Sequence, residues 1–342
     1  MALQTSATLA QGYRAAKEDI ALRDASAAGG RLRLQGKDAL DLLHRLSSND
    51  LLALEPWRWA PTVLTNSKGR VLDHLRVHRL PDHLLVYTGP GNAPKVAEWI
   101  DLYTFLEEST VADVTAETGV LQLLGPQTPA FLGSINGGLR AVEHGAVAEA
   151  RLEDTSVMVS RDDSLGVPAY DLIAPAAGIA HLEALLLDRG QPWGLCPIGD
   201  EVFEALRIQA GVPLYGKEMS EQVNPLEAGL RPSISFTKGC YIGQEVVLRL
   251  DTYRKVQRHL VRLELEGEGA PPSRAAIAVD GKTVGSVTSA AAAPTGGKVV
   301  ALGMVRAAHD KAGQQVEVTA GDRRWSGCLF SLEQYAREGT GR

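Results

Sequence analysis

Two hydrophobic periodicities alternate along the first 250 residues. Apolar residues at helical spacing predict a helix over residues 37–47, where five of them form one face: Ala39, Leu40, Leu42, Leu43 and Leu46. Over residues 70–80 apolar and polar residues alternate instead, which predicts a half-buried strand. Further short strands and helices follow irregularly and lack the steady repeat of βαβ units. This mixture predicts an α+β fold.

Three short apolar segments in this region lead to specific expectations. Residues 94–106 start with a proline, a residue that suits the first helical turn, and predict a helix. Residues 120–124 form an apolar strand that ends at a Gly-Pro pair. Residues 246–248, Val-Val-Leu, have the composition of a strand leaving a loop.

The pattern changes after residue 253, where only strands are predicted. Alternating stretches occur at residues 261–265, 276–279, 283–288, 299–305, 315–319 and 324–330. Asp280-Gly281 separates two of them and predicts a tight hairpin turn. We therefore expect a first region over residues 1–255 and an all-β, barrel-like domain over residues 256–342.

Composition excludes several classes of protein. The 342 residues carry a formal net charge of −6, whereas dedicated duplex-DNA binders usually have a basic excess. No apolar stretch is long enough to span a membrane, and the N-terminal stretch lacks the pattern of a secretory signal. The three cysteines form neither a CxxC pair nor a disulfide framework, so we expect no metal site and a cytoplasmic protein.

The most informative motif is Lys-Gly-Cys-Tyr-Ile-Gly-Gln-Glu at residues 238–245. Lys238 stands two residues from Cys240, so its charge can hold that thiol partly as thiolate. Tyr241 offers a flat face, and Gln244 opens the apolar run that follows. A tight turn with a half-buried cysteine is the alternative. The eight residue types together favour a functional loop.

Three charged residues outside the motif are candidate ligands or catalysts. Asp171, beside Tyr170 at the head of a strand, can accept two parallel N–H bonds from an amino-pyrimidinone edge, which pterin, guanine and arginine share. Arg207 can bind a carboxylate or a carbonyl-rich ring, or form a salt bridge with Glu204 one helical turn away. Asp73 shares a strand face with apolar residues, where a carboxylate is costly unless it has partners. A strand-end aspartate in solvent is the alternative for Asp171.

The motif at residues 238–245, together with residues 206–216, 224–230 and 64–77, resembles the YgfZ-type folate-binding proteins. These are the iron–sulfur accessory branch of the glycine-cleavage T-protein (aminomethyltransferase) superfamily. The resemblance implies three domains around a central hole that holds tetrahydrofolate, with two interleaved α+β domains before the barrel. It places Asp171 and Arg207 at pterin-binding positions, and Asp73 where aminomethyltransferases have a catalytic acid pair.

Three functional hypotheses follow. The first is a cytosolic folate-binding accessory protein for iron–sulfur enzymes, including one that thiomethylates tRNA. In it Cys240 and Lys238 perform thiol chemistry, while Tyr241 and Gln244 line the folate site. The second is a folate-dependent aminomethyltransferase or demethylase that uses Asp73. The third is weak tRNA contact through a basic run: Arg249, Arg254, Lys255 and Arg258. Nothing in the sequence suggests an obligate assembly, so a monomer is expected.

Overall fold

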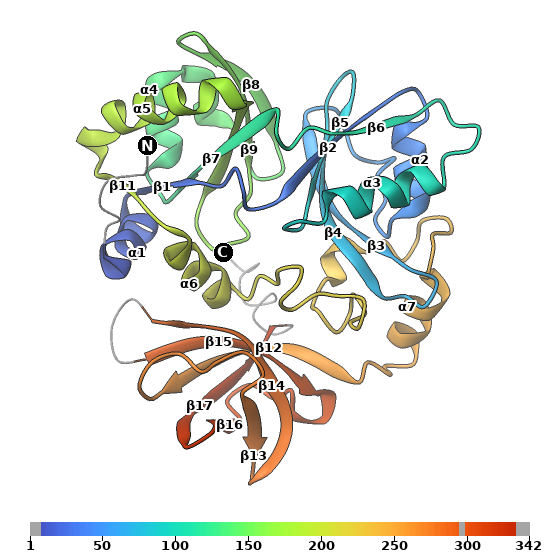
Figure 1. The fold of residues 1–342 in the computed structure, drawn as a ribbon, viewed down its shortest axis with the longest axis vertical. Coiled ribbons are helices and arrows are strands. Elements are labelled where there is room, and N and C mark those ends of the chain that lie inside the picture. Colours follow the sequence, from blue (N-terminus) through green and yellow to red (C-terminus); the bar gives the residue numbers. More distant parts are fainter. Residues whose placement is uncertain (1–7, 294–297, 333–342) are drawn as a thin grey trace. The chain divides into compact units, whose positions relative to one another are not determined.

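The computed structural model describes residues 8–293 and 298–332, which fall into two compact units (Figure 1). Unit 1 comprises residues 1–64, 73–202 and 233–241. Unit 2 comprises residues 65–72, 203–232 and 242–342. The chain therefore passes between the units several times. These limits differ from the predicted boundary after residue 255, because three segments before it belong with the barrel.

Unit 1 contains a six-stranded sheet with the strand order β11-β1-β7-β10-β9-β8. Its strands are β1 (Ile20–Asp24), β7 (Thr118–Leu124), β8 (Val147–Leu152), β9 (Thr155–Arg161), β10 (Ala169–Pro175) and β11 (Leu195–Pro197). The accompanying helices are α1 (Leu9–Glu18), α4 (Thr128–Ile135) and α5 (Ile179–Gly190), with short 3₁₀ turns η1 (Gly137–Ala141), η2 (Ala176–Gly178) and η3 (Gln191–Trp193). One face of the sheet packs on α4 and α5, as Figure 1 shows, through a buried cluster that includes Leu123, Leu172 and Leu186.

Unit 1 also holds most of a five-stranded sheet with the order β3-β4-β5-β2-β6. Its strands are β2 (Gly30–Gln35), β3 (Arg58–Thr65), β4 (Val71–Arg79), β5 (Leu84–Thr88) and β6 (Thr110–Asp113), and its helices are α2 (Ala39–Leu46) and α3 (Ala93–Leu102). A second buried cluster joins this sheet to the six-stranded one through residues such as Leu85, Val120 and Ile173. We call the layer between the two sheets of unit 1 the seam.

Unit 2 ends in a closed barrel with the order β12-β15-β14-β13-β16-β17. Its strands are β12 (Arg258–Glu266), β13 (Ala276–Val279), β14 (Lys282–Ala292), β15 (Lys298–Arg306), β16 (Gln315–Ala320) and β17 (Arg323–Ser331), and a 3₁₀ turn η5 (Ala307–His309) follows β15. Asp280 and Gly281 both have positive φ, +50° and +72°, which is the backbone of the tight hairpin turn expected there. The α+β fold with a C-terminal β-barrel is thus confirmed.

Helices α6 (Asp200–Ala210) and α7 (Gln244–Thr252) and the turn η4 (Arg231–Ser233) precede the barrel. The prediction of a strand at residues 246–248 is wrong, because these residues lie inside α7. Gly243 has φ +83° and ends the preceding loop, so the helix starts at Gln244 with the carboxylate of Glu245 in its first turn. Such a short apolar run does not distinguish strand from buried helix by periodicity.

Two other expectations about the elements need correction. The helix predicted over residues 94–106 ends at Leu102, and Phe105 and Leu106 lie in the following loop with 80% and 96% exposure. The apolar pattern also indicated no element before residue 37, yet α1, β1 and β2 lie there. Helix α1 starts with a capping box between Thr8 and Gln11, a local signal that the apolar pattern does not contain.

Candidate functional site

A row of polar residues crosses the seam-facing side of the six-stranded sheet. Arg23 of β1 pairs in register with Gln122 of β7, Gln122 with Asp171 of β10, and Asp171 with Ser160 of β9. Their neighbours along each strand point to the opposite face and form the apolar core, because strand side chains alternate between faces. The seam is therefore polar where this row crosses it.

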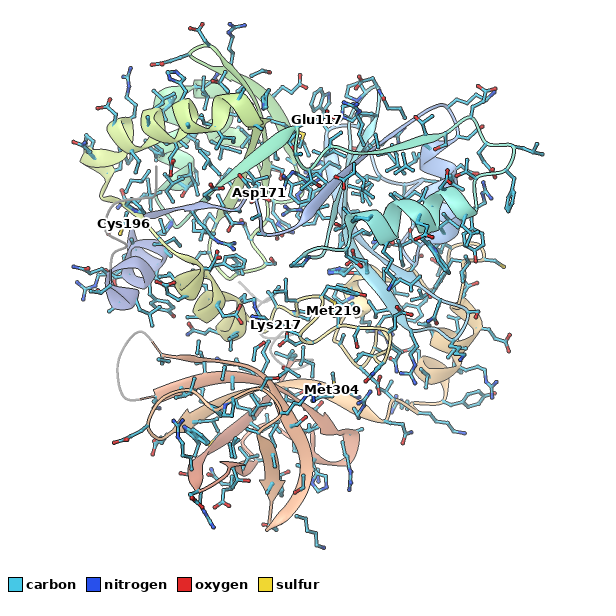
Figure 2. All side chains as sticks on the ribbon, in the orientation of Figure 1. Glu117, Asp171, Cys196, Lys217, Met219 and Met304 are labelled. Carbon is cyan, nitrogen blue, oxygen red and sulfur yellow. The ribbon has the colours of Figure 1, made fainter. Side chains whose placement is uncertain are left out.

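Asp171 is the centre of this row and is 4% exposed (Figure 2). One carboxylate oxygen, Oδ1, accepts a hydrogen bond from Gln122 Nε2 at 2.9 Å. The other, Oδ2, forms a close ion pair with the guanidinium of Arg76, which reaches across the seam from β4. Arg76 also contacts Asp162 at 3.2 Å. The expectation of a solvated strand-end aspartate is thus wrong, since Asp171 is buried and its charge is paired.

Two aromatic rings enclose the Arg76 guanidinium. Its central carbon lies 4.7 Å from the Tyr87 ring centre and 5.4 Å from that of Trp59. Burial disfavours the charge of Arg76, but the carboxylates of Asp171 and Asp162 outweigh burial and raise its pKa. Burial also raises the pKa of Tyr87 well above its usual value, and Asp171 adds to the effect. The seam therefore holds a permanent cation beside an anion between flat rings.

The neighbouring histidines of β4 are neutral at physiological pH. His74 and His78 share the face of Arg76, and their ring nitrogens lie 2.8 Å from Ser233 Oγ and 3.2 Å from Ser160 Oγ. Burial lowers the pKa of His74 to about 4 and that of His78 well below its ordinary value. The ion cluster at this end of the seam is formed by Arg76 with Asp171 and Asp162.

Asp73 points to the other face of β4 and is completely buried. Its carboxylate accepts N–H bonds from Gly89, at 2.9 Å to Oδ2, and from His74, at 2.8 Å to Oδ1. Burial raises its pKa to about 6, against the opposing effect of these bonds and of Asn92. The expected need for partners is met by the backbone. A catalytic role of Asp73 stays a prediction, and the geometry favours a structural one.

Lys238 binds backbone carbonyls at the end of helix α2. Its ammonium donates to the carbonyl oxygens of His44, Ser47 at 2.7 Å and Asn49 at 3.0 Å. These three bonds use all three donors of an ammonium group. The ammonium therefore anchors the loop before Ile242 to the C-terminal end of α2, where a cation is favourable. This anchoring, in place of the expected activation of Cys240, is the role that the geometry favours.

The rest of the motif is divided between an exposed thiol and a buried ring. Cys240 is exposed, whereas Tyr241 is 7% exposed with its ring centre 5.6 Å from the Lys238 ammonium. Burial raises the pKa of Tyr241 to about 12. Gln244 is the first residue of α7 and belongs to unit 2. Folate binding by Tyr241 and Gln244 stays a prediction.

Arg207 lies in a buried ion cluster within unit 2. Its guanidinium donates to both carboxylate oxygens of Glu204, at 2.7 and 2.5 Å, and to the Val212 carbonyl at 3.0 Å. It also donates to Glu218 at 3.1 Å and to Ser289 Oγ at 2.7 Å. These bonds use all five N–H donors of an arginine. The salt bridge with Glu204 is thus present, and the satisfied donors favour a structural role over the predicted pterin contact.

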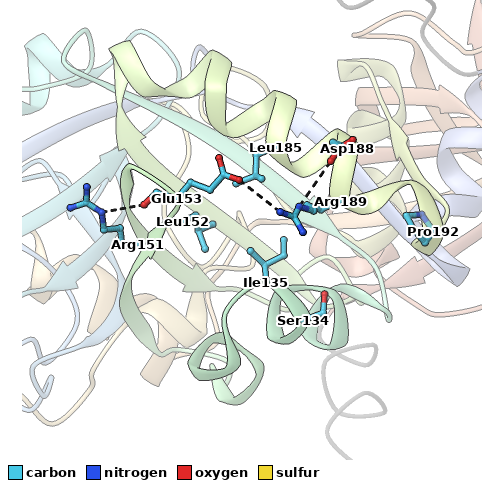
Figure 3. Close-up of a pocket in the computed structure, with 9 residues that line it drawn as sticks. All are labelled: Ser134, Ile135, Arg151, Leu152, Glu153, Leu185, Asp188, Arg189 and Pro192. Atoms are coloured by element: carbon cyan, nitrogen blue, oxygen red, sulfur yellow. Dashed lines mark hydrogen bonds and ion pairs between the residues drawn. The ribbon is translucent and has the colours of Figure 1, made fainter.

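A pocket on unit 1 has none of the candidate residues described above in its lining (Figure 3). It has a volume of about 430 Å³ and is lined by Ser134, Ile135, Arg151, Leu152, Glu153, Leu185, Asp188, Arg189 and Pro192. Glu153 lies between its two arginines, with its carbonyl 3.1 Å from Arg151 and its carboxylate 3.9 Å from Arg189. The charges of this pocket compensate one another.

Arg76, Gln122 and Tyr87 are the site residues that the sequence analysis missed. Arg76 shares a strand face with His74 and His78, so the alternation of β4 already contained its position. The alternation could not predict the partner of Arg76, because Asp171 lies 95 residues further along the chain. Within the described residues, no group of three His, Cys, Asp or Glu side chains has metal-binding geometry, and no helix is long and apolar enough to cross a membrane.

Comparison with protein families identifies the class of fold that holds this site. The model described as the GCVT N-terminal domain matches residues 3–238, and the glycine cleavage T-protein C-terminal barrel domain matches residues 258–327. The chain therefore belongs to the glycine-cleavage T-protein family.

Of three similar proteins, two carry the name aminomethyltransferase and one is named a putative transferase. One from Symbiobacterium thermophilum is 32% identical over 93% of this chain and 86% of its own. One from Moorella thermoacetica is 30% identical over 90% and 84%. A putative chloroplastic transferase of Arabidopsis thaliana is 28% identical over 84% of this chain and 66% of its own.

The crystal structure of the glycine cleavage system aminomethyltransferase T from Bartonella henselae superposes with a TM-score of 0.82. The alignment covers 95% of this chain and 88% of that one at 21% identity, which shows the shared fold. The superfamily expected from the motifs is thus confirmed. Membership of the YgfZ-type branch is a finer assignment than these comparisons make.

Proposed function

We propose that the protein is a tetrahydrofolate-dependent one-carbon transferase of the aminomethyltransferase type, and that Asp171 binds the pteridine ring. The observation that carries this proposal is the buried, ion-paired carboxylate of Asp171 in the polar seam of unit 1. The names of the similar proteins support the reaction class. This is the alternative, rather than the first, of the hypotheses based on the sequence.

The donor and acceptor groups of Asp171 fit such a ring. A carboxylate offers about four lone-pair positions, and Gln122 and Arg76 occupy one on each oxygen. The remaining positions can accept the adjacent N–H and NH2 groups of an amino-pyrimidinone edge as two parallel bonds. Bound tetrahydrofolate supplies the nitrogen that carries the one-carbon unit. Asp171 would orient the ring, and a fixed orientation is what group transfer requires.

Calorimetric titration with tetrahydrofolate tests the proposal. The wild-type protein should bind, and Asp171→Asn should weaken binding about 100-fold, because two hydrogen bonds to a charged group contribute about 3 kcal/mol. Asp163→Asn is the matched control and should leave the affinity unchanged, since Asp163 pairs with a different arginine, Arg161, at 2.9 Å. Wild-type affinity in Asp171→Asn, or no binding by the wild type, would refute the proposal.

The catalytic roles assigned from the sequence need a separate assay. Turnover of an aminomethyl group carried on a lipoyl thiol, in the presence of tetrahydrofolate, is the direct measurement. If Asp73 is the catalytic acid, Asp73→Asn should abolish turnover while folate affinity stays unchanged. If Asp73 is structural, turnover should persist in the folded variant.

A second candidate function is the accessory role in assembly or repair of iron–sulfur enzymes. The observation that favours it is the exposed thiol of Cys240 on a loop anchored by Lys238. In a deletion strain under oxidative stress, the wild-type gene should restore iron–sulfur enzyme activity and Cys240→Ser should not. Equal rescue by both would remove the thiol, and with it this candidate.

Contact with tRNA is the least supported of the expectations. Arg258 of the basic run already pairs with Glu227 at 3.0 Å, which leaves less positive charge for an RNA backbone. Binding of tRNA that weakens steeply with salt would support the contact, because phosphate contacts release counterions. Binding that is absent or independent of salt would dismiss it.

A further inference from the structure

We propose that Arg76 is a positioning residue for the ligand: its guanidinium holds the Asp171 carboxylate in one orientation and balances its negative charge. The site then accepts a flat ring edge that donates two parallel N–H bonds. This inference rests on the proposed function, because it concerns the same carboxylate. It adds a residue on a different sheet, and it states which chemical edge the site selects.

The geometry of the seam carries the first step. Asp171 is held from two directions, by Arg76 across the seam and by Gln122 from the adjacent strand. Register fixes Gln122, since it is the direct cross-strand partner of Asp171. The guanidinium of Arg76 is fixed in turn by Asp162 and by the rings of Tyr87 and Trp59. A carboxylate held this way has one orientation available for a ligand, which is the condition for a precise contact.

Charge supplies the second step. A buried carboxylate without a cation takes up a proton more readily, because burial disfavours the charged form. A protonated carboxyl carries a hydrogen where the ring edge also carries hydrogens, so the two would repel. Arg76 places a positive charge against the carboxylate, so the site favours ligand groups that donate hydrogen bonds over groups that accept them. An edge that presents carbonyl oxygens in place of N–H groups is excluded on the same grounds.

The other groups that face this ion pair do not change charge near neutral pH. Tyr87, His78 and His74 surround Arg76, and burial keeps all three uncharged between pH 5.5 and 8. Asp162 lies on the far side of the guanidinium. Arg76 itself contributes to the low pKa of His74 and His78, so a pH dependence of ligand binding that appears when Arg76 is replaced reports on the charges that its cation controls in the seam.

The test measures the Kd of tetrahydrofolate from pH 5.5 to 8 for wild type, Arg76→Met and Arg76→Lys. The ratio of variant to wild-type Kd removes the titration of the ligand itself. For Arg76→Met we expect a ratio of about 10 at pH 8, the loss of one charge-assisted contact, and a larger ratio at pH 5.5 than at pH 8. For Arg76→Lys, which keeps the cation, we expect a ratio above 1 that is constant with pH.

Arg161→Met is the matched control. Arg161 has 22% side-chain exposure against 18% for Arg76, pairs with Asp163 at 2.9 Å, and lies 5.4 Å from the Tyr170 ring centre. It thus has the same kind of environment with a different carboxylate, and its ratio should stay near 1 at every pH. If Arg76→Met does not fold, Arg76→Lys decides alone: a constant ratio above 1 supports the inference, and any other result overturns it.

The outcomes separate the inference from the function on which it rests. No binding of tetrahydrofolate by wild type or by Arg161→Met would refute the proposed function. Binding by wild type together with a ratio for Arg76→Met that is constant with pH would overturn only the role of Arg76. Tighter binding by Arg76→Met would also overturn it, because it would mean that the guanidinium competes with the ligand for Asp171.

Discussion

Arg76 in unit 1 and Arg207 in unit 2 are both arginines paired with buried carboxylates, yet Arg76 is half-buried, Arg207 is buried, and their surroundings differ. The side chain of Arg207 is 1% exposed and its five donors are used by protein groups. The side chain of Arg76 is 18% exposed, contacts two carboxylates and lies between two aromatic rings. A closed set of partners stabilises a fold, whereas a charged pair with unused acceptor positions can also bind a ligand. The same ion-pair chemistry therefore serves different purposes in the two units.

The largest effect that sharpens this comparison is expected at Arg207. Arg207→Met should lower the free energy of unfolding by about 4 kcal/mol, because the buried carboxylate of Glu218 loses its cation and keeps only its hydrogen bonds from Leu214 and Ser289. Urea denaturation measures the change, and adding Glu218→Gln should recover part of it. If the free energy of unfolding is unchanged while tetrahydrofolate binding is lost, Arg207 contacts the folate, as the sequence predicted.

The next effect concerns the pH dependence of stability at Asp73, the buried acid that has backbone partners. Its pKa is about 6 in the folded protein against an ordinary 3.8, so the folded state binds this proton more tightly. Its contribution to stability is present below the ordinary value and is lost as the pH rises through about 6, a change of about 3 kcal/mol. Between pH 4 and pH 7 the free energy of unfolding of wild type should fall by about 2.4 kcal/mol more than that of Asp73→Asn, which carries no titrating group at this position. Parallel pH profiles would contradict the burial of the charge.

A smaller effect is expected at Lys238, where a cation is also fully used by protein acceptors. Lys238→Met should cost about 2 kcal/mol, since three carbonyls at the end of α2 lose a charged donor. Burial lowers the pKa of Lys238 to about 8, so the comparison is made at pH 6–7.5, where its charge is present; there Lys238→Met should change the rate at which a disulfide reagent modifies the exposed Cys240 little relative to wild type at the same pH. Cys240→Ser identifies the signal. A large fall in the thiol's reactivity at neutral pH would restore the activating role expected from the sequence.

The smallest effect is expected at Arg258, whose side chain is 43% exposed and pairs with Glu227. Arg258→Met should change the free energy of unfolding by less than about 1 kcal/mol. The exposed guanidinium of Arg258 can be replaced at Glu227 by water, and Arg70 still contacts the same carboxylate. Urea denaturation of Arg258→Met and Arg207→Met under the same conditions compares their free energies of unfolding directly. If both variants lose the same free energy of unfolding, burial does not explain the difference expected between Arg207 and Arg258.

Local patterns account for the parts of the fold that the sequence predicted well. The alternation over residues 70–80 became β4, and the Asp-Gly pair became the turn between β13 and β14. The same reasoning was wrong for residues 246–248, because three apolar residues fit either period. The apolar neighbours of Asp73 correctly indicated that it needs partners, although not which ones.

The sequence by itself determined the two hydrophobic periodicities and the C-terminal all-β domain. It also identified the motif with Cys240 and Asp171 as a candidate binding residue. These are properties of neighbouring residues, which share dihedral preferences and solvent exposure. Only the tertiary structure decided that Arg76 meets Asp171, that Lys238 binds carbonyls and that the donors of Arg207 are all used. Such contacts depend on strand register and on packing between segments far apart in the chain. The conformational preferences of neighbouring residues do not determine which distant segments come into contact.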